Sequence, residues 1–206
     1  GVQTCALPIC YITDRRQLGG NLNEQCVRLL DKIAEAAEAG VRPPEPADEG
    51  SSLTIRYDAF FPSQSLISVR FASDSYHAGA AHGMTQHAGL LLALDRGRPL
   101  GVDDLFRRDS GWQAAVAHHC LKQLTQADGG EPGSDFLPDD AANAVRDVVS
   151  DLANWSFDRE SALVTFDPYT LFAYAAGTQD VIVPYAVIRP FLRPDAPLGQ
   201  EAAPAP

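Results

Sequence analysis

The sequence predicts an α+β fold, with a mainly antiparallel sheet packed against two or three helices. Segments whose apolar residues alternate, as in strands, are grouped at 53–95 and again at 162–185. Segments with apolar residues every three or four positions, as in helices, lie at 21–39 and between the two strand groups. Because helices and strands are segregated along the chain and do not alternate, the strands are expected to pair antiparallel. A chain of 206 residues is long enough for one domain with a substantial hydrophobic core.

Residues 1–9 resemble an in-frame translation of a sequencing adapter and are not expected to be part of the fold. On this interpretation the natural chain begins near Cys10 as an internal fragment, so a missing signal peptide carries no information. Residues 10–52 then hold an amphipathic helix at 21–39, which Gly40 is placed to end, followed by an acidic Pro-rich loop.

Three strands are expected next, over 53–61, 65–73 and 84–95. A turn centred on Gly79 and Ala80 sets the register of the second and third strands, and three apolar pairs then fall on one face of the hairpin. These pairs are Phe71 with Ala88, Val69 with Leu90, and Ile67 with Leu92. The third strand is apolar on both faces near its end, which predicts a central place in the sheet.

Two helices follow, and the first, over 111–126, is expected to pack on the hairpin sheet. Ser110 is placed to be its N-cap, after a short helical turn over 101–106. The second helix is expected to begin at Asp139 or Asp140. The residues expected to face inward are Trp112, Val116, Cys120 and Leu124 in the first helix, and Ala142, Val145, Val149 and Leu152 in the second.

The chain returns to strands at 162–166 and 180–185, followed by a short helical turn over 187–191. The last segment, 193–206, is rich in Pro and Ala and has no packing pattern. It is expected to be a flexible tail.

The charge of the chain limits its partners. There are 27 acidic and 16 basic side chains, for a formal net charge of -11. This charge disfavours nucleic acid and anionic membrane surfaces, and it either favours cationic partners or serves solubility. No apolar run approaches the roughly 20 residues that a transmembrane helix needs. Without the adapter-like segment the cysteines are Cys10, Cys26 and Cys120, too few for a disulfide scaffold.

The motifs of common enzymes are missing from the sequence. It has no phosphate-binding Gly-rich loop, nucleophile elbow, His-Glu-x-x-His or Cys-x-x-Cys. This makes the familiar motif-bearing enzymes improbable, though not enzymes in general, and no cofactor is expected. His77 and His82 would lie opposite each other across the hairpin turn. They are weak candidates for a divalent metal site, because no carboxylate or thiolate is placed to complete it. A weak metal-dependent enzyme using this pair is therefore a distant alternative, and surface histidines are the favoured interpretation.

Several short motifs in one order resemble a known family. They are YHAGAAHG at 76–83, DRGRPL at 95–100, DDLF at 103–106, FDPY at 166–169, YAAG at 174–177 and VIVP at 181–184. Residues 53–192 thereby resemble the C-terminal extracytoplasmic domain of the anti-sigma factor RsiV, which is also found in the peptidoglycan deacetylase PdaC. Ala80 stands where the family has a second glycine in the hairpin motif.

The resemblance implies a non-catalytic module of the cell envelope, periplasmic or extracytoplasmic, that binds lysozyme or another cationic protein, or cell-wall glycan. Exposed aromatic residues are the usual anchors of binding energy, so Tyr76, His82, Tyr169 and Tyr174 are the candidate contact residues. The alternative is an accessory domain of a peptidoglycan-modifying enzyme such as a polysaccharide deacetylase.

Overall fold

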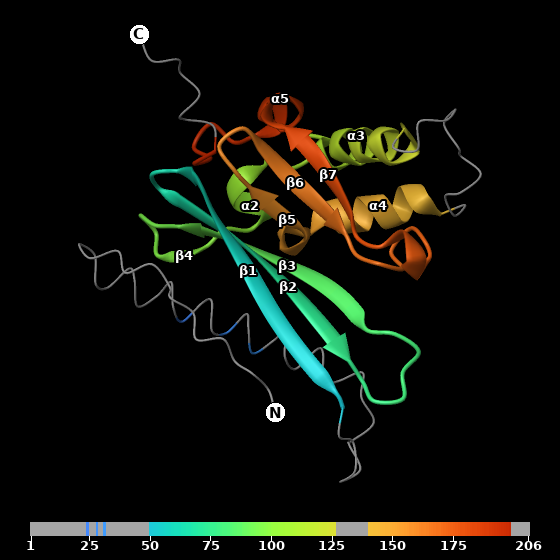
Figure 1. The fold of residues 1–206 in the computed structure, drawn as a ribbon. Helices are drawn as coiled ribbons and strands as arrows, with labels where there is room; N and C mark the ends of the chain where they lie inside the picture. Colours follow the sequence, from blue (N-terminus) through green and yellow to red (C-terminus); the bar gives the residue numbers. More distant parts are fainter. Residues whose placement is uncertain (1–23, 25–27, 29–30, 32–49, 127–139, 199–206) are drawn as a thin grey trace.

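Two antiparallel sheets and four α-helices lie within residues 50–126 and 140–198, which together with residues 24, 28 and 31 are the part of the chain that the computed structural model describes (Figure 1). The first sheet has the strand order β1 (Ser52–Ser63), β2 (Leu66–Tyr76), β3 (Met84–Ala93) and β4 (Arg98–Pro99). The second has the order β5 (Trp155–Phe157), β6 (Ser161–Phe166) and β7 (Gln179–Pro184). The predicted α+β class with antiparallel sheets is therefore confirmed.

The helices lie between and after these strands. They are α2 (Val102–Leu105), α3 (Trp112–Gln126), α4 (Ala141–Ser150) and α5 (Tyr185–Ile188), with single 3-10 turns at η2 (Leu152–Asn154), η3 (Tyr174–Ala176) and η4 (Arg189–Phe191). No helix in the described ranges is long and apolar enough to cross a membrane.

The β2–β3 hairpin has the register that the sequence predicts. Phe71 lies opposite Ala88, Val69 opposite Leu90 and Ile67 opposite Leu92. The turn closes with a hydrogen bond from the main-chain nitrogen of Ala80 to the carbonyl of His77 (2.9 Å), and Gly79 has a positive φ of 84°. The prediction was possible because the turn and the apolar pairs that set this register both depend only on residues close together in the sequence.

The two faces of the first sheet belong to different apolar clusters. Ile67, Val69, Phe71 and Leu92 are buried together on one face. On the opposite face, Leu66, Leu91 and Ala93 join the main core, which also contains the inward faces of the helices and of the second sheet. The first sheet is therefore apolar on both sides near β2 and β3, as expected for central strands.

Four aromatic rings form the centre of the main core. Phe106 stacks on Trp112 with ring centroids 4.1 Å apart, and Trp155 stacks on Phe157 at 5.8 Å. Trp112 meets Trp155 edge to face at 6.4 Å. The indole nitrogen of Trp155 donates to the carbonyl of Val149 (3.0 Å), so its one polar group is satisfied.

Helix α3 is placed differently from the prediction. Its stripe of Trp112, Val116 and Cys120 is buried, as expected. However, α3 packs against α4, α5 and β7, and the expectation that it lies on the hairpin sheet was wrong. The reason is the second sheet, whose apolar face covers the helix. Its first strand, β5, is too short to leave an alternating pattern in the sequence.

Three smaller expectations also differ from the structure. Ser110 does not cap α3: its hydroxyl donates to the carbonyl of Arg107, and the carbonyl of Gly111 accepts the first helical bond. In α4, Ala141 is buried where Ala142 was expected. The chain past Arg193 is also not free at its start, because the Arg193 nitrogen bonds the Leu105 carbonyl (2.8 Å) and Ala196 is fully buried.

Several predictions fall on residues that the structure does not describe. The adapter-like segment 1–9, Cys26 and the end of the tail, 199–206, lie outside the described residues. Within 21–39, the described residues Glu24, Arg28 and Asp31 are helical, as predicted, and Arg28 forms an ion pair with Glu24 one turn away.

Candidate functional site

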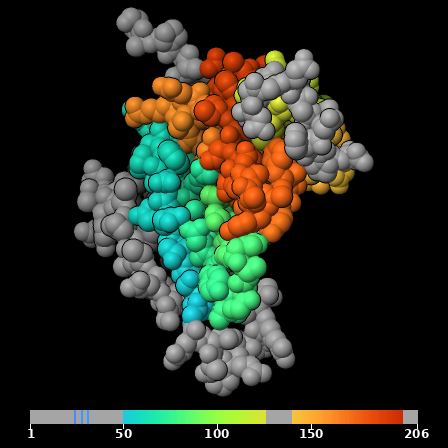
Figure 2. All heavy atoms as spheres, turned by 45° about the vertical axis from the view of Figure 1, so that its right-hand side comes forward, coloured from blue at the N-terminus to red at the C-terminus, as the bar shows by residue number. Residues whose placement is uncertain are grey.

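Three of the four predicted contact residues come together at the outer end of the β2–β3 hairpin. His82 lies in the turn that precedes β3, while Tyr169 and Tyr174 lie in the loop between β6 and β7. The His82 ring stacks on Tyr174 with centroids 3.7 Å apart and planes at 20°, and Tyr169 lies 5.8 Å from Tyr174. We call His82, Tyr169 and Tyr174 the aromatic patch. Figure 2 shows the surfaces of the hairpin end and of this loop meeting.

Hydrogen bonds fix the orientation of His82 within the patch. Its Nδ1 lies 2.8 Å from the carbonyl of Gly83, which can only accept, so Nδ1 carries a proton and donates. The hydroxyl of Tyr169 lies 3.2 Å from Nε2. In the neutral ring Nε2 is therefore the acceptor and the Tyr169 hydroxyl the donor. Both ring nitrogens are engaged, and the ring presents its face and edge, not a free lone pair.

Tyr169 is both strained and exposed. Its φ of 70° lies in the left-handed region, which costs a non-glycine residue about 1–3 kcal/mol. A turn holds this conformation, since the Tyr169 nitrogen donates to the carbonyl of Phe172 and the Thr170 nitrogen to that of Asp167 (3.1 Å each). Even so, 55% of the Tyr169 surface remains exposed. Strained residues of this kind cluster at active sites and ligand-binding loops, which makes Tyr169 a candidate for recognition.

A His–Asp pair at the start of the β6–β7 loop, which carries Tyr169 and Tyr174, was missed by sequence reasoning. One Asp167 oxygen accepts from Nδ1 of His87 (2.7 Å) and the other from the His87 main-chain nitrogen (3.0 Å). The His87 side chain is only 12% exposed. The pair ties the start of the β6–β7 loop to the side of β3. No sequence signal could reveal it, because eighty positions separate the two residues.

Two more polar contacts join the hairpin to the second sheet. Arg70 on β2 donates to both oxygens of Asp180 on β7 (2.8 and 2.9 Å), and Asp180 also accepts from the hydroxyl of Thr165. The hydroxyl oxygen of Ser68, which is buried, accepts from the main-chain nitrogen of Phe157 (3.0 Å). Several hydrogen bonds therefore fix the hairpin, which holds His82, to the second sheet.

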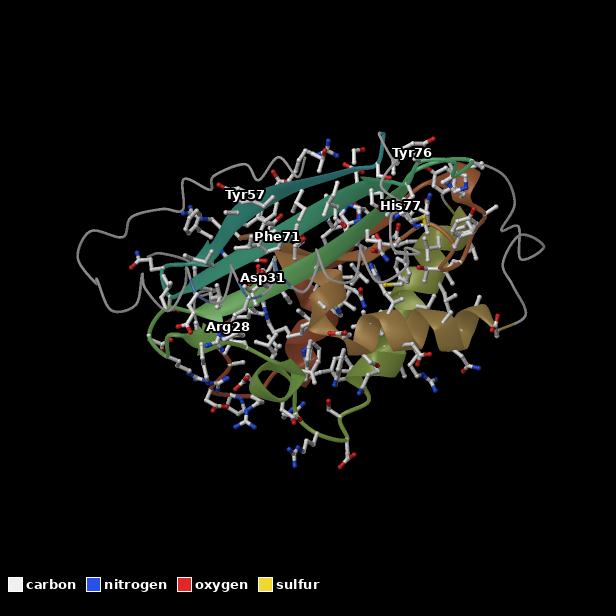
Figure 3. All side chains as sticks on the ribbon, turned by 90° about the horizontal axis from the view of Figure 1, so that it is seen from below. Arg28, Asp31, Tyr57, Phe71, Tyr76 and His77 are labelled. Atoms are coloured by element: carbon white, nitrogen blue, oxygen red, sulfur yellow. The ribbon has the colours of Figure 1, made fainter. Side chains whose placement is uncertain are left out.

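Tyr76 and His77 lie at the same end of the hairpin (Figure 3). Tyr76 ends β2 and is 38% exposed, and it makes no ring contact with the patch among the described residues. His77 contributes its main-chain carbonyl to the turn. The fourth predicted contact residue is therefore near the patch but not part of it.

The patch is a poor place for a metal ion. To ligate a cation, His82 would have to give up its bond to Gly83 or to Tyr169. No set of three or more histidine, cysteine or acidic side chains in the described part of the chain is arranged to hold a metal. Among the residues that the structure describes, none supplies His77 and His82 with the further ligands that a divalent site requires.

The other perturbed groups serve structure. Burial raises the pKa of the Cys120 thiol to about 12, which makes it inert as a nucleophile at neutral pH. Burial also raises the pKa of Tyr185, whose hydroxyl donates to the carbonyl of Asp158. The hydrogen bond from Arg98 lowers the pKa of Asp104 to about 2. A hydrolytic triad would need a hydroxyl or thiol bonded to His87, and the described residues provide none.

A family model matches the second half of this fold. Residues 103–186 match the DUF3298 family, described as protein of unknown function. The match covers α2 to the start of α5 and includes Tyr169 and Tyr174, whereas His82 lies before it. No curated protein matches the chain.

Solved structures of the DUF3298 family share the fold. A member from Bacteroides fragilis is 20% identical, with a TM-score of 0.56 over 92% of this chain and 74% of its own. A member from Pseudomonas aeruginosa is also 20% identical, with a TM-score of 0.51 over 81% of this chain and 80% of its own. The similarity extends beyond residues 103–186 and so includes parts of the first sheet. At this identity it establishes the fold alone.

Proposed function

We propose that the chain is a non-catalytic binding domain of the cell envelope that recognises a cationic protein through the aromatic patch. The observation that carries the proposal is Tyr169, a strained tyrosine that stays 55% exposed beside the stacked rings of His82 and Tyr174. Tyrosines in exposed, rigid settings are frequent anchors of protein interfaces. The RsiV-like motifs at 76–83 and 166–177 support the envelope location, and they make lysozyme the first partner to test.

The charges of the chain suit such a partner. A net charge of -11 attracts a cationic protein and accelerates encounter. At the patch, the exposed tyrosine face can accept a lysine or arginine side chain by a cation–π contact, worth about 0.5–1 kcal/mol at an exposed site. Steering by charge and anchoring by the ring would then act at different stages of binding.

A titration with lysozyme tests the proposal. We expect a complex whose association slows when salt rises from about 0.05 M to about 0.5 M, because the Debye length falls from about 14 Å to about 4 Å. Dissociation should change less. A complete lack of binding at about 100 μM, which excludes affinities stronger than about -5.5 kcal/mol, would overturn lysozyme as the partner.

Two variants locate the contact surface. Tyr169→Gly removes the ring and fits the left-handed backbone, so the fold is kept while binding should weaken by at least about tenfold. Ile182→Ala is the matched control, because Ile182 is 60% exposed on β7 and lies outside the patch. Equal binding by wild type and Tyr169→Gly would show that the patch is not the contact surface.

The second candidate is an accessory domain of a peptidoglycan-modifying enzyme, with the patch binding cell-wall glycan. The flat faces of stacked His82 and Tyr174 favour it, since such faces suit sugar rings as well as cations. Sedimentation with purified peptidoglycan, compared between wild type and Tyr169→Gly, separates the two candidates. Cosedimentation that the variant loses, without lysozyme binding, would favour the glycan.

A further inference from the structure

Strand β1 forms the outer edge of the first sheet. Within the described ranges it pairs only with β2, and its pairing is regular from Ser52 to Phe60. A register shift follows between Phe60 and Ser63, where Pro62 cannot donate a main-chain hydrogen bond. A long regular edge of this kind is a template for another strand, and natural proteins usually blunt it.

The charges on β1 are arranged for an antiparallel copy of itself. Arg56 and Asp58 are both exposed and flank Tyr57. A two-fold axis normal to the sheet and passing through Tyr57 places each Arg56 opposite Asp58 of the other copy. Centring on Arg56 or on Asp58 instead would place identical charges opposite each other, which is destabilising. Only the register centred on Tyr57 satisfies both charges.

The neighbouring ion pairs leave these groups available. Arg70 pairs with Asp180, and one terminal nitrogen of Arg56 pairs with Asp74 (2.6 Å). Asp58 takes part in no ion pair among the described residues, although it lies opposite Arg70 in the sheet. The Arg56 side chain is 69% exposed and keeps further donors, so it can bridge its own Asp74 and the second copy's Asp58.

The other face of β1 is apolar at the same positions. Ile55 and Tyr57 pack on the cluster that holds Phe71, with the Tyr57 and Phe71 rings 6.3 Å apart (Figure 3). In the register centred on Tyr57, Ile55 meets Ala59 of the second copy and the two Tyr57 rings meet each other. The apolar cluster would thereby continue across the joined sheets.

We propose that a second copy of this chain docks on β1, antiparallel and centred on Tyr57, to give a continuous sheet across a symmetric dimer. The paired segment runs from Thr54 to Phe60 in each copy, and the bulge and Pro62 end it. This dimer does not depend on the aromatic patch or its partner, because β1 and the patch lie on different elements.

Charge reversal tests the dimer and its register together. The full chain is expected to show a concentration-dependent dimer by sedimentation between about 5 and about 200 μM. Asp58→Arg puts like charges opposite each other twice, and so does Arg56→Asp. Each variant should raise the dimer dissociation constant by at least about tenfold while circular dichroism shows an unchanged fold.

Mixing the two variants provides the decisive control. One chain then carries two arginines at positions 56 and 58 and the other two aspartates, so both cross-strand pairs become attractive, and a heterodimer should form where each variant alone is monomeric. A full chain that remains monomeric throughout, a dimer that neither variant weakens, or a mixture that forms no heterodimer would overturn the proposal.

Discussion

Gly89 on β3 lies tightly against the backbone at the start of the second sheet. A Cβ atom at this position would lie 1.9 Å from the carbonyl oxygen of Trp155 and 3.2 Å from that of Ala153. Both neighbours are backbone and cannot move like a side chain. Gly89→Ala should therefore cost about 3 kcal/mol or more in unfolding free energy, at the upper end of overpacking effects.

Chemical denaturation checks this prediction, with Gly101→Ala as its control. The nearest atom to a Cβ at Gly101 is a flexible Asp104 oxygen at 4.0 Å, so the control should lose well under about 1 kcal/mol. Equal losses in the two variants would contradict the proposed close contact.

Asp104 makes the stability of the fold depend on pH in the acidic range. Its pKa lies near 2, mainly because Arg98 donates to it (2.6 and 2.9 Å), with help from the Gly101 main-chain nitrogen. The ordinary value is 3.8, so the folded state favours the carboxylate. The stabilisation is complete above pH 3.8 and is lost as pH falls toward 2. Asp104→Asn should be less stable than wild type at pH 6, and this difference should shrink toward pH 2 in urea denaturation. A difference in stability that stays constant with pH would show that the charge of Asp104 does not contribute to stability.

At the scale of elements, the loop between β6 and β7 depends on Asp167. Removing its carboxylate leaves the main-chain nitrogen and Nδ1 of His87 without their acceptor, at a cost of about 1–3 kcal/mol. We expect Asp167→Ala to lose this much stability and also to weaken binding by the patch, because the same loop carries Tyr169 and Tyr174. The measurements are urea denaturation and the lysozyme titration.

Asp95→Ala is the control for this loop prediction. Asp95 is 60% exposed, and its one ion pair with a described residue is a 4.0 Å contact with Arg96, so its removal should change stability by less than about 0.5 kcal/mol. If Asp167→Ala were as mild as this control, the His87–Asp167 pair would not be what holds the loop.

Elements whose partners are close in the sequence could be predicted, and those with distant partners could not. The β2–β3 register followed from a turn and three apolar pairs, all within Ile67 to Leu92. The place of α3 depends on β7, some sixty residues later, and the pattern of α3 shows only which of its faces is buried. The same holds for the site. His82, Tyr169 and Tyr174 could be chosen from the sequence as candidate contact residues. Their stacking and the His87–Asp167 pair could be seen only in the folded structure.

At the scale of the whole molecule, Cys120 reports on the main core. It is fully buried on α3, which packs against α4, α5 and β7, and burial raises its thiol pKa to about 12. At pH 8 only about one thiol in 10,000 would then be ionised, and only the thiolate reacts. A reagent can therefore reach Cys120 only after the core opens, so its rate of modification should follow the population of open molecules.

We expect a chain with Cys5, Cys10 and Cys26 replaced by Ser to react with a thiol reagent at least about 1,000-fold more slowly when native than in denaturant. Gly89→Ala and Asp167→Ala in this background should speed the native reaction by about tenfold for each 1.4 kcal/mol of stability that they lose. Gly89 and Asp167 are remote from Cys120 in the sequence and belong to the junction between the two sheets. A rate that tracks their stability would show that the hairpin, the second sheet and the helices open as one cooperative unit. Fast native labelling, or a rate indifferent to both variants, would instead mean that α3 opens on its own.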